Sequence, residues 1–306
     1  MAYKKGHLSC WKGLTKENSE RVRKRSEKIE KRIRNKDYFL LTLEKAYVFG
    51  TLCGDGWMSK HQIGLDVTDK DFAEFFSKCL QKVYGLNCSI KRKKKVGGYK
   101  KNGKEFIEIV LCSKKAKEDL LEYDITKKGF KTSTWRVPVE IKSAKKNVKS
   151  MFIRGFFDSE GGVYGRTIQS VSSNKKGLLD VLELLISLNI KSKLYEQKRE
   201  GRNLYRIEIC SRPNQAKYFR LIGFSIKRKQ DRLINLLKNS SRFNKFTPKQ
   251  YYEVQELHKQ GLGKVKISRQ MNINVGTISD WIYRKKKIMP LCIRNEDLKL
   301  DINCIN

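Results

Sequence analysis

The sequence predicts an α+β fold made of two similar halves, followed by a small helical unit. The first observation is a repeat, since Tyr47–Gly56 (YVFGTLCGDG) has the same layout as Met151–Gly161 (MFIRGFFDSEG). The acids that close the two stretches, Asp55 and Glu160, are 105 residues apart. The second observation is the charge, because 68 Lys and Arg against 32 Asp and Glu give a formal net charge of +36 over 306 residues. Such an excess predicts a polyanionic partner.

Nucleic acid is the expected polyanion. The basic residues run through the whole chain, no apolar run approaches the roughly 20 residues needed to cross a bilayer, and the N-terminus is no signal peptide. We therefore expect no membrane partner and an intracellular protein, in a prokaryotic or phage cytoplasm or in an organelle. The eight cysteines form no CxxC pair, which favours reduced, buried thiols over zinc or disulfides.

The first repeated stretch predicts a buried helix within residues 37–53, because its apolar residues fall on more than one side. Gly50 and Gly54 are four residues apart, so they share a face on which another backbone can approach closely. Asp55 follows the helix C-terminus, which already carries partial negative charge. Asp55 and Glu160 side by side would repel each other unless cations lay between them. The pair therefore predicts a metal site.

The chain then follows the same order after each stretch. In the first half we expect a strand, a helix, two hairpin strands and a helix at Gln62–Val67, Asp69–Tyr84, Cys88–Lys95, Glu105–Cys112 and Lys114–Leu121. In the second half the same elements fall at Arg166–Ser172, Lys176–Leu188, Lys191–Lys198, Leu204–Cys210 and Pro213–Leu221. Each half is therefore αββαββα-like, with a period of about 100 residues, which indicates a duplicated domain.

Long polar side chains alternate onto one face of the hairpin strands. A sheet face of this kind can lie in the major groove and contact base edges, although a solvated sheet face is the alternative. The candidate DNA-binding residues on and around these strands are Lys91, Lys93, Arg166, Gln169, Lys193, Tyr195, Gln197, Arg199 and Arg202.

Over roughly Tyr38–Leu237 the chain resembles the single-chain, two-motif LAGLIDADG homing endonucleases. Val48–Gly56 and Ile153–Gly161 fill the two motif positions, and Val137-Pro138 and Ile222–Lys227 (IGFSIK) match downstream pieces. The resemblance implies αββαββα half-domains at residues 37–142 and 143–238. Their motif helices would pack at a pseudo-twofold axis, and their antiparallel sheets would form a DNA-binding saddle.

The resemblance also implies the chemistry. Asp55 and Glu160 would hold Mg²⁺ (or Mn²⁺), with the carbonyls of Gly54 and Ser159 nearby, and one cut would be made per strand. Family members place a basic residue near each scissile phosphate. Lys70 and Lys175 occupy suitable positions, with Lys176 or Asn174 as alternatives for the second and generic phosphate contact as the plainer interpretation.

Three residues depart from the motif pattern. Cys53 stands where the first motif often has an acid, and Thr51 and Arg154 are unusually polar for motif helices. Arg154 lies on the outer side of its helix or loosens the helix pair. None of the three is a metal-holding residue, so activity remains the expectation.

Both ends of the chain carry further patterns. After a linker at 239–246, residues 247–290 predict three helices that resemble the helix-turn-helix domains of resolvases and transposases. Their third helix would present Thr277 and Ser279 to a groove, with Arg284 following; the alternative is a helical cap on the rest of the protein. Residues 291–306 form an uninterpreted tail. Residues 1–36 are a basic segment in which Trp11–Ile29 resembles the modular DNA-binding segments of homing endonucleases, or else is a solvated tail.

These patterns predict a site-specific DNA double-strand endonuclease that acts as a monomer on a long asymmetric site. Two alternatives stay open: an RNA-binding intron maturase, and a non-catalytic DNA-binding regulator. An enzyme embedded in an intein is not expected, because no splice-junction pair is found near the ends of the chain.

Overall fold

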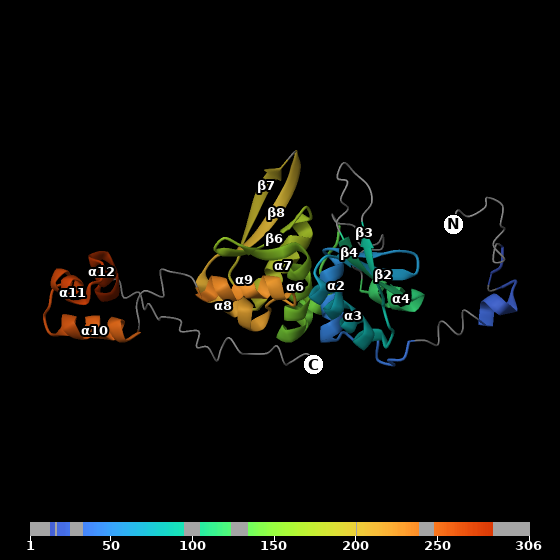
Figure 1. Ribbon diagram of the computed structural model, residues 1–306, viewed down its shortest axis with the longest axis horizontal. Coiled ribbons are helices and arrows are strands. Elements are labelled where there is room, and N and C mark those ends of the chain that lie inside the picture. Colours follow the sequence, from blue (N-terminus) through green and yellow to red (C-terminus); the bar gives the residue numbers. More distant parts are fainter. Residues whose placement is uncertain are drawn as a thin grey trace.

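The computed structural model describes residues 13–15, 17–24, 33–94, 105–123, 134–199, 201–238 and 248–283 (Figure 1). It confirms the predicted α+β class, with two antiparallel four-stranded sheets of order β1-β2-β4-β3 and β5-β6-β8-β7. The first sheet (β1–β4) and the second sheet (β5–β8) therefore share one strand order.

The elements of the two halves follow the αββαββα order that the sequence predicts. The first half contains α2 (Leu43–Leu52), β1 (Gly56–Met58), β2 (Gln62–Val67), α3 (Lys70–Tyr84), β3 (Ser89–Lys94), β4 (Glu105–Cys112) and α4 (Lys114–Leu121). The short α5 (Val139–Ser143) comes next, followed by α6 (Lys146–Glu160), β5 (Gly161–Tyr164), β6 (Thr167–Ser172), α7 (Lys175–Ser187), β7 (Lys193–Arg199), β8 (Arg202–Ile209) and α8 (Arg212–Leu221). A further helix, α9 (Lys227–Lys238), ends the second half.

The first motif helix is shorter than the apolar pattern suggests. Residues 37–40 form turns, and the helix begins at Leu43 because the Thr42 side chain accepts a hydrogen bond from the Lys45 amide at 3.2 Å. That side-chain oxygen satisfies one of the unpaired amides of the first turn, which sets where a helix can start.

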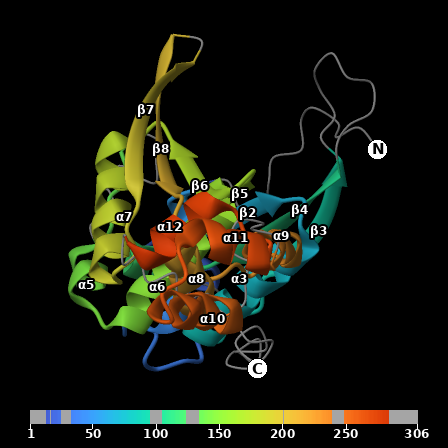
Figure 2. The same cartoon turned by 90° about the vertical axis from the view of Figure 1, so that its left-hand side faces the viewer.

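Each sheet has a core face and an open face. Ile109 and Leu111 of β4 are buried, as are Ile207 and Ile209 of β8, and the residues between them lie on the opposite, open side. Seen end-on, the β7–β8 hairpin and the β3–β4 pair rise on opposite sides of the body (Figure 2). The open faces are therefore the sheet surfaces left for a partner.

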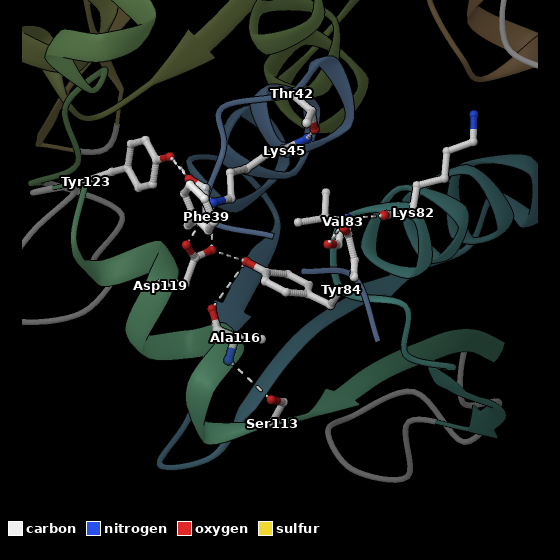
Figure 3. A network of polar contacts seen from close by, with 11 residues as sticks. Phe39, Thr42, Lys45, Lys82, Val83, Tyr84, Ser113, Ala116, Asp119 and Tyr123 are labelled. Carbon is white, nitrogen blue, oxygen red and sulfur yellow. Dashed lines mark hydrogen bonds and ion pairs between the residues drawn. The ribbon is translucent and has the colours of Figure 1, made fainter. Parts of the chain in front are cut away.

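A buried ion pair anchors the first motif helix to its neighbours. The Lys45 side chain is 0% exposed, and its Nζ lies 2.8 Å from Asp119 Oδ1 of α4 (Figure 3). The Tyr84 hydroxyl of α3 donates to Asp119 Oδ2 at 2.8 Å. Burial lowers the pKa of Lys45, and the hydrogen bond and charge of Asp119 oppose that shift. Three helices are thus held together by one carboxylate.

The C-terminal helices α10 (Pro248–Lys259), α11 (Lys264–Met271) and α12 (Val275–Ile282) form a cluster with its own core. That core consists of Val254, Ile267, Ile273, Ile278 and Trp281. The apolar Val275, the first residue of α12, would be expected in this core from the sequence, but it is 39% exposed and lies outside it. Within the described ranges, no helix is both long and apolar enough to cross a membrane.

Candidate functional site

Reciprocal glycine contacts pack α2 against α6. A Cβ on Gly50 would lie 2.0 Å from the Phe152 carbonyl oxygen, and a Cβ on Gly155 would lie 2.3 Å from the Tyr47 carbonyl oxygen. Neither position can carry a larger residue without moving the other backbone. The close approach brings the ends of the two helices together, and each end leads to one of the repeated acids.

Asp55 and Glu160 line one pocket of about 460 Å³. Glu160 is the last residue of α6, whereas Asp55 follows α2 by three residues, in the turn before β1. A Cβ on Gly54 would lie 2.3 Å from Ser159 Cβ and 3.0 Å from Glu160 Cγ, so the two chain segments touch at this point. The fold thus brings the two predicted acids together, and the residues that precede them, Gly54 and Ser159, lie next to each other.

The surroundings of the pair disfavour its charge. Burial raises the pKa of Glu160 to about 7, with a further contribution from the negative charge of Asp55. Burial also raises the pKa of Asp55, while the positive charge of Lys229 opposes the shift for both acids. Neither carboxylate has a hydrogen-bond or ion-pair partner among the described residues.

These properties fit a divalent cation. Two adjacent carboxylates without partners, desolvated and repelling each other, are stabilised by a positive ion between them. Their oxygens, together with backbone carbonyls, are the donors that Mg²⁺ and Mn²⁺ prefer. Among the described residues there is no group of three or more His, Cys, Asp or Glu side chains that could hold a metal. The fit therefore rests on the acid pair and nearby carbonyls.

A second acid of the motif, Asp158, has a structural role. It accepts hydrogen bonds from the Tyr47 hydroxyl at 2.8 Å, from the Ser225 hydroxyl at 2.6 Å and from the Ser225 amide at 3.1 Å. The same place in the first motif is Cys53, which is buried and whose pKa burial raises. Asp158 thus joins both motif helices to the segment before α9.

Lys229 of α9 is a site residue that the sequence interpretation missed. It is buried, lines the same pocket as the two acids, and donates from Nζ to the backbone oxygens of Asp158 at 2.5 Å and Phe157 at 3.2 Å. Burial lowers its pKa, and the negative charge of Asp158 is the largest opposing influence. A signal existed: in α9, with Leu233 and Leu237 buried, Lys229 occupies a place where an apolar residue would be expected.

The first residues of α9 form hydrogen bonds with the first half of the chain. The Arg228 guanidinium binds both carboxylate oxygens of Asp69, at 2.9 and 3.2 Å. The amide of Lys227 donates to Asp71 Oδ2. Two acids at the beginning of α3 therefore hold the helix that carries Lys229.

The two lysines predicted to be catalytic lie elsewhere. Lys70 begins α3, is 71% exposed and forms an ion pair with Glu74 at 3.2 Å. Lys175 begins α7 and forms an ion pair with Glu196 at 3.3 Å. Neither lysine lines the pocket with Asp55 and Glu160. Of the two alternatives, Lys176 is exposed, and Asn174 is buried as the N-cap of α7.

The candidate DNA-binding residues divide between the open faces and the turns. Lys91 and Lys93 are exposed on β3, and β7 presents Lys193, Tyr195 and Gln197 on the open side. Gln169 lies on the same open face as Lys193, because both residues pair with Glu208 of β8. Arg166 is an exposed residue of the β5–β6 turn. The backbones of Arg199 and Arg202 close the β7–β8 hairpin as register partners, and their side chains lie outside the described atoms.

In the C-terminal helices, Thr277 and Ser279 are half-buried residues of α12. The Asn274 side chain caps this helix by accepting from the Gly276 amide at 2.8 Å. Arg284, the linker 239–246, the tail 291–306 and most of the segment 1–36 lie outside the described residues.

The two polar residues of the motif helices have different surroundings. Arg154 Nε donates to the Ile222 carbonyl at the end of α8, so Arg154 lies on the outer side of α6, one of the two expected positions. Thr51 is buried, and its hydroxyl has no partner within the described part of the chain.

Two sheets of the same strand order, the close contact of α2 with α6 and the pocket shared by the two acids define a two-half α+β protein with one candidate site. Residues 147–223, which run from the second motif helix to the end of α8, match the LAGLIDADG-like domain family. That match includes Glu160 and leaves out Asp55 and Lys229.

Similar proteins include longer ones. The chain is 29% identical over 209 residues to a probable translation initiation factor IF-2 of Methanocaldococcus jannaschii, covering 65% of this chain and 16% of the relative. It is 28% identical over 136 residues to a replication factor C small subunit of that organism, covering 44% and 7%. The chain thus spans about a sixth or less of these relatives.

Solved structures with a similar fold include two DNA-bound homing endonucleases. I-DmoI in complex with DNA and Mn has 16% identity and a TM-score of 0.44, covering 60% of this chain and 97% of that chain. I-WcaI bound to its DNA recognition sequence has 15% identity and a TM-score of 0.44, covering 64% and 91%. Full-length WhiA from Thermatoga maritima has 13% identity and a TM-score of 0.44, covering 79% and 90%.

Proposed function

We propose that this chain is a metal-dependent, site-specific DNA double-strand endonuclease of the homing type, acting as a monomer. The observation that carries the proposal is the acid pair: Asp55 and Glu160 meet in one pocket, desolvated and without partners. We further propose that the two halves, residues 37–142 and 143–238, are duplicated and related by a pseudo-twofold axis through the contact of α2 with α6. The shared strand order and the reciprocal glycine contacts support this relation.

The Asp55 and Glu160 carboxylates would hold Mg²⁺ (or Mn²⁺), assisted by the carbonyl oxygens of Gly54 and Ser159. When bound, such an ion lowers the pKa of a coordinated water and neutralises charge at the phosphate. Before binding, the pocket must keep two carboxylates at hand in spite of their repulsion. The packing of the motif helices serves that purpose, because it holds the chain segments that carry the two acids in contact.

Lys229 would complete the site from the side of α9. Its ammonium is a buried positive charge that lines the pocket of both acids and lowers the pKa of each. By donating to the Asp158 and Phe157 carbonyls it fixes the end of α6, and so positions Glu160. Facing the same pocket, its charge would stabilise the phosphate negative charge. Lys70 and Lys175 would instead contact phosphates farther from the cut.

Double-stranded DNA would lie across the open faces of both sheets, where Lys91, Lys93, Gln169, Lys193, Tyr195 and Gln197 reach outward, with Arg166, Arg199 and Arg202 at the turns. The helices α10–α12 would act as a helix-turn-helix that adds contacts through Thr277 and Ser279 of α12, followed by Arg284. The basic segment 1–36 would lengthen the contact. The net charge of +36 supports a partner of high negative charge density.

A cleavage assay tests the proposal. With Mg²⁺ and a plasmid library, the wild-type chain should cut specific sites, and Asp55→Asn or Glu160→Gln should abolish cutting while DNA affinity changes less than about threefold. Glu118→Gln removes an exposed acid of α4 that pairs with Lys114 and serves as the matched control, with cutting unchanged. Cutting that persists in either acid variant would contradict the assignment.

The same experiment separates the alternatives. DNA binding without cutting by the wild-type chain would favour the non-catalytic regulator. Rescue of intron splicing by the Asp55→Asn chain would favour the maturase, because splicing assistance needs the surface and not the acids.

A further inference from the structure

In each sheet, three residues that pair across neighbouring strands form a row. Each row begins the same number of residues after the acid of its half. In the first sheet, Asp66 of β2 pairs with Glu108 of β4, and Glu108 pairs with Lys91 of β3. We call Asp66–Glu108–Lys91 the acidic row. Asp66 follows Asp55 by 11 residues and lines the pocket that contains it.

The second sheet places different residues in the equivalent row. Val171 of β6 follows Glu160 by 11 residues and pairs with Arg206 of β8, which pairs with Tyr195 of β7. We call Val171–Arg206–Tyr195 the arginine row. The shared strand order and the shared spacing from the acids make the two rows counterparts, with opposite charge in the central strand.

Both rows lie on the open faces. Leu65 and Ile109, the neighbours of the acidic row, are buried in the core, so Asp66 and Glu108 point to the other side. The same alternation applies to Arg206, between the buried Tyr205 and Ile207. Each row therefore lies on the sheet surface that is open to a binding partner.

The acidic row is electrostatically unfavourable unless a hydrogen-bond donor or a positive charge lies next to its carboxylates. Two carboxylates directly opposite each other on a sheet repel. Glu108 is compensated by Lys93, whose Nζ lies 2.5 Å from Glu108 Oε1, but Asp66 has no ion-pair or hydrogen-bond partner among the described residues. A DNA phosphate would add to the repulsion. The donors that a carboxylate can accept from in the major groove are the amino groups of cytosine and adenine.

The arginine row is built to donate. Arg206 Nε lies 2.8 Å from Glu208 Oε1, and the guanidinium carbon lies 5.7 Å from the centre of the Tyr195 ring. The carboxylate and the ring hold the guanidinium on the open face, where Nη1 also donates to Gln197 Oε1 at 3.4 Å. Paired donors in that geometry match the O6 and N7 acceptors of guanine.

We propose that these two rows set unequal base preferences at equivalent positions of the DNA site. The acidic row selects a base pair that offers an amino donor, cytosine or adenine, and the arginine row selects guanine. The inference rests on the proposed binding of DNA by the open faces. It adds which residues make the site asymmetric beside the cut.

Exchange of the rows tests the proposal. The full chain, without divalent metal so that DNA stays intact, is used to select from randomised duplexes. The variant Asp66→Val/Glu108→Arg/Lys91→Tyr gives the first sheet the arginine row, and guanine should replace the amino-donor base there, with at least tenfold enrichment. The selected site then becomes an inverted repeat at that position. Lys78→Gln, an exposed change on α3, should leave the selected site unaltered.

Arg206→Lys, which keeps the charge but loses the paired donors, should reduce guanine selection in the second half-site about 10- to 100-fold. This single variant decides the question if the triple variant fails to bind DNA. A wild-type site that persists in both variants overturns the inference and leaves the proposed function intact. A wild-type chain that enriches no sequence overturns both.

Discussion

The Tyr47 hydroxyl of one motif helix donates to Asp158 Oδ2 of the other at 2.8 Å, two residues before Glu160. The bond is buried, and Ser225 donates to Asp158 Oδ1 from its amide at 3.1 Å and to Oδ2 from its hydroxyl at 2.6 Å. Burial raises the pKa of Asp158, and these hydrogen bonds work against the rise.

Tyr47→Phe should therefore lower the free energy of unfolding by about 1–2 kcal/mol, because a buried carboxylate loses one donor. Urea denaturation measures the change, and Tyr195→Phe, on the exposed face of β7, is the control with no loss. Equal stability of the two variants would contradict the role of the bond.

Gly50→Ala and Gly155→Ala should each cost more than about 3 kcal/mol, since the added methyl group would overlap backbone atoms that cannot rotate away. Gly263→Ala has no atom within 4 Å of the new Cβ and a negative φ, so its cost should stay within about 1 kcal/mol. Denaturant midpoints of the three variants test this order. A Gly50→Ala chain as stable as the Gly263→Ala chain would refute the close helix contact.

Lys45→Met should destabilise the chain by about 3–5 kcal/mol, because Asp119 would remain buried without its ion-pair partner. The double variant Lys45→Met/Asp119→Leu removes both charges and should recover most of that loss. Thermal unfolding of the two single variants and the double variant gives the coupling energy. Additive effects would mean that the pair does not interact.

Glu160→Gln should stabilise the metal-free chain at pH 8 relative to wild type, by a free energy on the order of 2 kcal/mol. The folded pKa of about 7 lies above the ordinary value of 4.5, so the folded state binds more protons between these values. Wild-type stability therefore falls as pH rises through this window, and the variant lacks that fall. Melting temperatures at pH 5 and pH 8 measure it.

The stabilisation of the chain by Mg²⁺ should depend on the same ionisation. Mg²⁺ should raise the wild-type melting temperature more at pH 8 than at pH 5, because only the ionised acids bind it. Glu118→Gln should show the wild-type behaviour at both pH values. An absence of any pH-dependent difference between Glu160→Gln and wild type would show that Glu160 ionises normally.

Much of the fold could be predicted from the sequence because the signals are local or repeated. Alternation of apolar residues predicts β4 and β8, and the 105-residue spacing of the two acids is also the spacing of Gly50 and Gly155. Helix boundaries were less accurate where capping decides them, as at Thr42.

The site could be predicted only in part, because its charged residues are far apart in the sequence and meet only in the folded chain. Asp55 and Glu160 follow from the repeat, whereas Lys229 stands in a run of basic residues, IKRKQ. In such a run only packing determines which lysine is buried. Lys70 and Lys175 lie at the starts of α3 and α7, where they form ion pairs with Glu74 and Glu196, and neither lines the pocket of the two acids.

The glycine contacts have a consequence for how such a chain can arise. Gly50 meets the Phe152 carbonyl and Gly155 meets the Tyr47 carbonyl, so the surface that each motif helix offers is the surface that it receives. Under the proposed pseudo-twofold relation this is an isologous contact, the kind that lets one half pair with an identical copy of itself. Fusion of two such halves into one polypeptide fixes their stoichiometry. It also frees each half to accumulate its own substitutions, so that a symmetric ancestor could give rise to an asymmetric descendant.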